Sequence, residues 1–123
     1  MATTYEILRD KRLIVVTSSG EIDPDETIRS LEQLYGDPEY SPDYDLLWDA
    51  SETTTVFTYD DMQRLIQHYK SYSGDKHPKR AIVVPPNGGH GRLRVFEGML
   101  TIRSRAQIGL FFDRKEALKW LGR

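Results

Sequence analysis

The sequence predicts an α/β domain built on a mostly parallel five-stranded sheet with flanking helices, in the element order ββαβαβαβα. Two observations lead to this prediction. Short runs of β-prone residues alternate with segments of helical periodicity, and a capping residue precedes most of the helical segments. Strands that alternate with helices pair in parallel, because each helix crosses the sheet before the next strand begins. We expect residues 1–123 to form one single domain.

The N-terminal part of the chain predicts a hairpin followed by a helix. Tyr5–Leu8 and Leu13–Thr17 are β-prone, and the polar Arg9–Arg12 between them favours a hairpin, so the first strand is expected to be antiparallel. Asp23 can cap the following helix, which has a proline in its first position, and Gly36 is expected to end it. The apolar face of this helix consists of Ile28, Leu31, Leu34 and Tyr35.

The rest of the chain repeats the alternation of strand and helix. Asp45–Asp49 predicts the third strand, and the polar Ser51–Val56 after it predicts a loop or an irregular extension. Thr58 and Asp61 have the spacing of a capping box at the start of a second helix. The remaining elements are expected to be a buried strand at Ala81–Val84, a loop at Pro85–Gly91, a helix at Arg92–Arg103, a strand at Ile108–Phe112 and a final helix capped by Asp113.

The composition excludes several classes of protein. The chain has no cysteine, which excludes disulfides, thiolate nucleophiles, Cys-based zinc sites and iron–sulfur clusters. No apolar run approaches the roughly 20 residues of a membrane span, and the N-terminus lacks the pattern of a signal peptide. We therefore expect a cytoplasmic protein without a membrane span. The net charge of −2 argues against nucleic-acid binding.

The charge is unevenly distributed along the chain. Residues 1–61 carry 4 basic and 15 acidic side chains, whereas residues 62–123 carry 13 basic and 4 acidic ones. If the strands lie in chain order across the sheet, the molecule has an acidic flank and a basic flank. Opposite flanks attract each other, which predicts salt-sensitive self-association, in its simplest form a homodimer.

Three segments of the chain, taken together, indicate a family. They are the hairpin from Tyr5 to Ile22, the run Leu46–Asp49 followed by Phe57-Thr58, and the closing strand, aspartate and helix from Phe111 to Leu121. In this combination nearly the whole chain resembles the STAS domain, and in particular the SpoIIAA-like single-domain bacterial proteins of uncharacterised function. The resemblance implies a non-catalytic role in binding partner proteins or small ligands. Regulated STAS domains carry a phosphorylated serine at the start of the second helix; this chain has Asp60 there, which implies that the switch is missing.

Ligands of open parallel sheets bind outside the carboxyl ends of the strands. This rule brings Ala50–Tyr59, Pro85–Gly91 and Asp113 to one edge. Glycines in the second segment let backbone N–H groups approach an anion, the arginines that follow offer planar donors, and the histidine adds a titratable one. We therefore predict a ligand-binding site that consists of Asp49, Ser51, Thr58, Asp60, Gly88, Gly89, His90, Arg92 and Arg94.

Each of these features also has a purely structural interpretation, as a flexible turn, a solvated charge or a helix cap. The alternative function is a small hydrolase or transferase that uses Ser51 and His90, although no serine stands in a nucleophile elbow. Further alternatives are a metal on the acidic residues 43–61 and an acyl-chain pocket formed by Leu65, Tyr69, Phe96 and Leu100. The sequence thus predicts a non-catalytic binding or regulatory domain without a cofactor, whose partner is a protein or a small anionic or amphipathic ligand and not nucleic acid.

Overall fold

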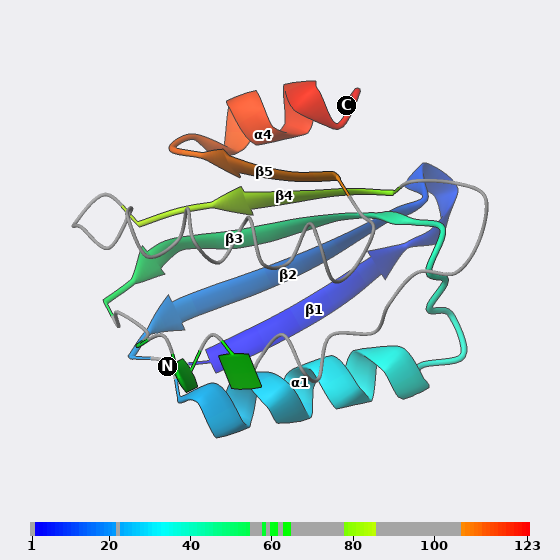
Figure 1. The fold of residues 1–123 in the computed structure, drawn as a ribbon. Coiled ribbons are helices and arrows are strands. Elements are labelled where there is room, and N and C mark those ends of the chain that lie inside the picture. The colour runs from blue at the N-terminus through cyan, green and yellow to red at the C-terminus, as the bar shows by residue number, and fades with distance from the viewer. Residues whose placement is uncertain are drawn as a thin grey trace.

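The computed structural model describes residues 2–21, 23–54, 58, 60–61, 63–64, 78–85 and 107–123. A five-stranded sheet forms the centre of the molecule, and its strands lie in chain order from one side to the other (Figure 1). Helices with defined bounds among these residues are α1 (Pro24–Gly36), α4 (Arg114–Trp120) and the short 3-10 helix η1 (Arg9–Lys11). The strands are β1 (Ala2–Leu8), β2 (Leu13–Gly20), β3 (Asp45–Thr53), β4 (Lys79–Val83) and β5 (Gln107–Phe111).

The pairing of the strands confirms the predicted α/β class and its mostly parallel sheet. β1 runs antiparallel to β2, and every other neighbouring pair is parallel. The strands β2 to β5 therefore all end on one side of the sheet, which we name the carboxyl edge, and begin on the opposite side, the amino edge (Figure 1). The strands lie in chain order, which is the condition stated above for an acidic flank and a basic flank. β1 with α1 lies on one side of the molecule, and β5 with α4 lies on the other (Figure 1).

The predicted caps begin both helices. The Asp23 carboxylate accepts a hydrogen bond from the Asp25 amide at 3.0 Å, and the Asp113 carboxylate accepts one from the Lys115 amide at 2.8 Å. Each bond satisfies an amide that the helix itself leaves without a partner. α1 ends at Gly36 as predicted, although this glycine does not adopt the left-handed conformation of a typical helix end.

The third strand is longer than the sequence predicts. β3 continues to Thr53, so of the two conformations predicted for the segment that begins at Ser51, a loop or an irregular extension, the structure shows the extension as far as Thr53. The run from Ser51 to Thr53 lacks the apolar alternation of a strand, but after a shift in register Glu52 pairs with Ser19 and Thr53 with Gly20. The neighbouring strand β2 therefore decides the conformation of this segment.

Successive side chains of the strands point to opposite faces and form two cores. The core under α1 consists of Ile14, Val16, Leu34 and Leu46, with Trp48 and several tyrosines packed around it. The core under α4 consists of Leu13, Val15, Leu47, Ala81, Val83, Ala117 and Leu121. Trp120 packs against this second core, and its ring centroid lies 5.4 Å from that of Phe111. Both tryptophans therefore pack against a core, Trp48 on the α1 side of the sheet and Trp120 on the α4 side.

Several predictions concern residues outside the described ranges. They are the second helix beyond residue 64, the glycine-rich loop after Pro85, the helix at Arg92–Arg103 and the acyl-chain pocket of Leu65, Tyr69, Phe96 and Leu100.

Candidate functional site at the carboxyl edge

Asp49 is the centre of a hydrogen-bonded cluster at the carboxyl edge. It lies in β3 on the face that α4 covers, in register with Val83 of the core. Its Oδ1 accepts hydrogen bonds from the Ser51 hydroxyl at 2.6 Å and from the Ser51 amide at 3.1 Å. Its Oδ2 accepts one from Nη1 of Arg114, the first residue of α4, at 3.2 Å. The cluster therefore ties the end of β3 to the start of α4.

These contacts determine the charge state of Asp49. Burial by itself would raise the pKa of the carboxyl group, because a charge is less stable away from water. The hydrogen bonds from the Ser51 hydroxyl and amide, together with the bond and positive charge of Arg114, outweigh burial and lower the pKa of Asp49 below its ordinary value. Asp49 is thus held as a carboxylate, which makes it a weak base toward the Ser51 hydroxyl.

Two side chains at the junction of β5 and α4, the ring of Phe112 and the guanidinium of Arg114, are exposed. Phe112, which directly follows β5, is 64 % exposed. The side chain of Arg114 is 49 % exposed although it is bonded to Asp49, whose own side chain is only 14 % exposed. We name Asp49, Ser51, Phe112 and Arg114 the carboxyl-edge surface.

One further residue of the predicted site, Thr58, takes part in a helix cap, and another, Asp60, lies in the turn that follows. Thr58 and Asp61 form the predicted capping box: the Thr58 amide donates to Asp61 Oδ2 and the Asp61 amide donates to Thr58 Oγ1, both at 3.1 Å. Asp60 is exposed in the helical turn that follows. Arg64, in the same turn, forms an ion pair with Asp25 of α1. No contact between described residues joins Thr58 or Asp60 to Asp49, so the structure brings together only part of the predicted site.

The other predicted site residues are Gly88, Gly89, His90, Arg92 and Arg94, and they lie outside the described residues. Their role in binding an anion stays a prediction, as does the pairing of His90 with Ser51.

Sequence reasoning missed Phe112 and Arg114. The sequence placed Phe112 at the end of the last strand and Arg114 in the final helix, and the predicted site included neither of them. Their position was the signal that could have found them, since both flank a capping aspartate at the carboxyl end of a strand. Residues at that point face the same edge as the ends of the other parallel strands.

The amino edge differs, because its polar groups bind other parts of the chain. Asp45 accepts a hydrogen bond from the Lys79 amide at 2.8 Å, and its Oδ2 lies 3.5 Å from Nη2 of Arg123. The Arg123 guanidinium also donates to the carbonyl oxygens of Lys11, at 2.9 Å, and of Leu121, at 2.6 Å. These bonds join the beginnings of β3 and β4, the η1 turn and the end of the chain.

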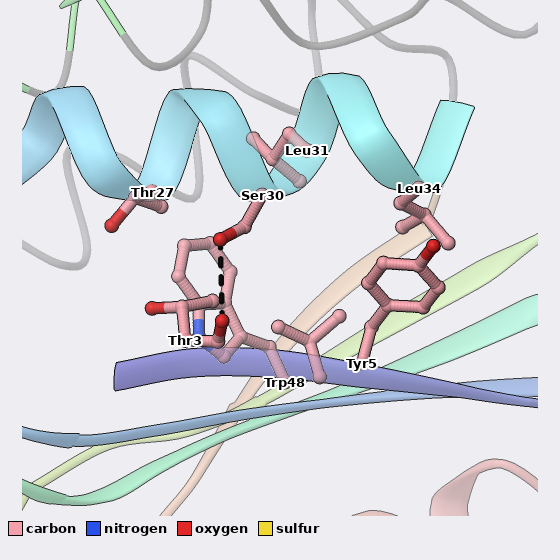
Figure 2. A pocket seen from close by; sticks show the side chains of 8 residues that line it. Thr3, Tyr5, Thr27, Ser30, Leu31, Leu34 and Trp48 are labelled. Carbon is pink, nitrogen blue, oxygen red and sulfur yellow. Dashed lines mark hydrogen bonds between the residues drawn. The ribbon is translucent and has the colours of Figure 1, made fainter. Parts of the chain in front are cut away.

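A small pocket lies between α1 and the sheet (Figure 2). The side chains of Tyr5, Leu31, Leu34 and Trp48 are among those that line it, and its free space holds roughly one water molecule. Its polar neighbours bond to one another, since Ser18 Oγ accepts from Trp48 Nε1 at 2.8 Å and lies 3.0 Å from Thr3 Oγ1. We therefore regard this pocket as a packing feature and not as a ligand site.

The acidic residues 43–61 do not gather into a metal site within the described part of the chain. No group of three histidine or acidic side chains there has the arrangement to hold a metal ion. Asp45, Asp49 and Asp61 instead accept hydrogen bonds in three separate places.

Comparison with known proteins found no family model that matches the chain and no curated protein sequence similar to it. Within the described residues, no helix is long and apolar enough to cross a membrane.

Proposed function

We propose that the chain is a non-catalytic binding domain that recognises a partner protein through the carboxyl-edge surface. The observation that carries this proposal is the exposed ring of Phe112 close in the chain to the Arg114 guanidinium, which Asp49 holds in place. Aromatic residues and arginine are enriched in protein interfaces, whereas lysine and acidic residues are depleted. A guanidinium that is already oriented loses less conformational entropy on binding than a free one.

The bonding of Ser51 supports a binding role over the hydrolase or transferase alternative. A nucleophilic serine gives its proton to a base whose pKa lies near the working pH, such as an uncharged histidine, an uncharged amine or a carboxylate of raised pKa. Ser51 instead donates to Asp49 at 2.6 Å, and the pKa of Asp49 is lowered. This pair is suited to holding the end of β3 and not to activating a hydroxyl.

The proposal agrees with the STAS resemblance. A five-stranded mixed sheet with an antiparallel first strand is compatible with that fold, and we propose a SpoIIAA-like member without the phosphoserine switch. A cytoplasmic location and an anion bound by the segment Gly88–Arg94 stay predictions from the sequence.

Affinity capture with matched variants tests the proposal. Wild type, Phe112→Ser, Arg114→Gln and the control Arg9→Gln, which replaces an exposed arginine at the other edge, are immobilised and exposed to lysate of the source cell. We expect at least one protein that wild type and Arg9→Gln retain and that both edge variants lose; the purified protein must then bind with the same ranking. Equal retention by all four forms, or labelling of Ser51 by a fluorophosphonate probe, would contradict the proposed function.

A further inference from the structure

The two outer strands of the sheet differ in how their outward-facing backbone groups are bonded. At β1, the Thr3 amide donates to Glu26 Oε1 of α1 at 2.9 Å, and the Ser30 hydroxyl of α1 donates to the Thr3 carbonyl at 3.2 Å (Figure 2). Helix α1 therefore occupies the outer side of β1 at this point. A strand edge that is covered in this way cannot accept a further strand there.

At β5, the backbone groups alternate between the inner and the outer side. The Gln107 amide donates to the Pro78 carbonyl at 3.0 Å, and the Phe111 carbonyl accepts from the Val84 amide at 2.8 Å. The amide and carbonyl groups of the odd-numbered residues of β5 therefore point toward β4. In a parallel ladder, the residues between them point their amide and carbonyl groups the other way. These are Ile108 and Leu110, and no described residue bonds to their outward-facing groups.

The composition of β5 adds a second difference. Natural proteins protect open strand edges with charged residues, proline or a bulge. The strand Gln-Ile-Gly-Leu-Phe contains no charge and no proline, and it pairs with β4 without a shift in register. The exposed Phe112 follows directly and extends the apolar character of this edge.

We propose that β5 is a self-association edge, which pairs antiparallel with β5 of a second copy of this chain. A two-fold axis at Gly109 sets Ile108 opposite Leu110 of the partner subunit, and the outward groups of these two residues then bond to each other. Gly109 faces its own counterpart at the narrow spacing of about 4.5 Å that a non-hydrogen-bonded pair has. In a dimer of identical strands, a charged residue would meet charges of the same sign across the axis. Because β5 contains no charged residue, two copies can pair in this register without such repulsion.

The size and chemistry of this contact determine how the dimer behaves. A five-residue strand with one exposed ring buries less surface than the roughly 1,200 Å² of a stable interface, so we expect a weak, concentration-dependent dimer. Backbone hydrogen bonds between uncharged strands respond little to salt, whereas attraction between an acidic and a basic flank is screened by it. Salt therefore separates this dimer from association through the charged flanks.

Hydrogen exchange followed residue by residue by NMR tests the proposal on the wild-type protein. We expect the amides of Ile108 and Leu110 to exchange fast in dilute samples and to become protected as the concentration rises, at low and high salt alike. The Gly109 and Phe111 amides, which face β4, should be protected throughout. A monomer at every concentration, a dimer that salt dissociates, or Ile108 and Leu110 amides whose exchange does not depend on concentration would each overturn the proposal.

A pair of matched substitutions tests the location independently. Gln107→Lys places a charge opposite Phe111 of the partner subunit, and Gln33→Lys makes the same change on the exposed side of α1. We expect Gln107→Lys to raise the dissociation constant in sedimentation velocity by about tenfold and Gln33→Lys to leave it unchanged. Equal dissociation constants for the two variants would overturn the assignment of the interface to β5.

Discussion

The two edges of the sheet use similar polar residues in different ways. At the amino edge, Asp45 and Arg123 bond to backbone groups and to each other, and so connect segments that lie far apart in the sequence. At the carboxyl edge, Asp49 and Arg114 form one cluster, Arg114 stays half exposed, and Phe112, two residues before it in the chain, is exposed. The comparison indicates that the amino edge serves the stability of the fold, whereas the carboxyl edge also holds two side chains, those of Phe112 and Arg114, that stay in contact with solvent.

The largest effect is expected at the amino edge. Asp45→Ala leaves the Lys79 amide without its acceptor and removes the partner of Arg123, so we expect a loss of about 2 kcal/mol in the free energy of unfolding. Urea unfolding measures this loss. The exposed Asp10 is the matched control, and Asp10→Ala should cost less than about 0.5 kcal/mol. Similar losses for the two variants would mean that the amino edge does not stabilise the fold as described.

A smaller effect is expected for Asp49→Asn, and it should depend on pH. The substitution removes the charge that Arg114 and Ser51 bind, and because the pair is partly exposed we expect a loss of about 1 kcal/mol at neutral pH. The pKa of Asp49 is lowered in the folded protein, so its contribution is complete above the ordinary aspartate pKa and is lost as the pH falls toward the lowered value. Unfolding curves of wild type and variant at a series of pH values should therefore converge in acid. A difference that stays constant over that range would contradict the assigned charge state.

Ser51→Ala should cost less than Asp49→Asn. The Ser51 hydroxyl bond to Asp49 is lost, but the Ser51 amide and Arg114 still hold the carboxylate, so we expect about 0.5 kcal/mol in thermal or urea unfolding. The pKa of Asp49 should rise toward its ordinary value, which NMR titration of the carboxyl carbon measures. A loss of stability larger than that of Asp49→Asn would show that Ser51 has a role beyond this bond.

The smallest effect on stability is expected for Phe112→Ser. The ring is 64 % exposed, so its removal should change the free energy of unfolding by less than about 0.5 kcal/mol. This substitution separates binding from stability, because it should abolish partner binding while the melting temperature stays close to that of wild type. If Phe112→Ser unfolds the protein at a markedly lower temperature, Phe112 belongs to the core and not to the carboxyl-edge surface.

Local sequence signals predicted the elements well where the chain itself supplies the stabilising contact. Asp23, Thr58, Asp61 and Asp113 cap helix starts as their spacing predicts, because a capping side chain reaches only amides two or three residues away. At Ser51 the sequence left a loop and an irregular extension open, since the pairing with β2 that decides between them comes from residues about 30 positions earlier. The candidate site was predicted only in part for the same reason: Asp49 was identified, but its partner Arg114 is 65 positions away.

By itself, the sequence determined the α/β class, the positions of the strands, the helix starts after Asp23, Thr58 and Asp113, and the uneven charge, all of which follow from composition, periodicity and contacts over a few residues. The tertiary structure alone decided that the strands lie in chain order, which groups occupy each edge, and that Asp49 is bound between Ser51 and Arg114. It also decided that α1 occupies the outer side of β1 at Thr3, whereas the outward groups of Ile108 and Leu110 in β5 bond to no described residue. The physical reason is that hydrogen bonding and charge state at an edge depend on groups that only the packing of distant segments brings within about 3 Å of each other.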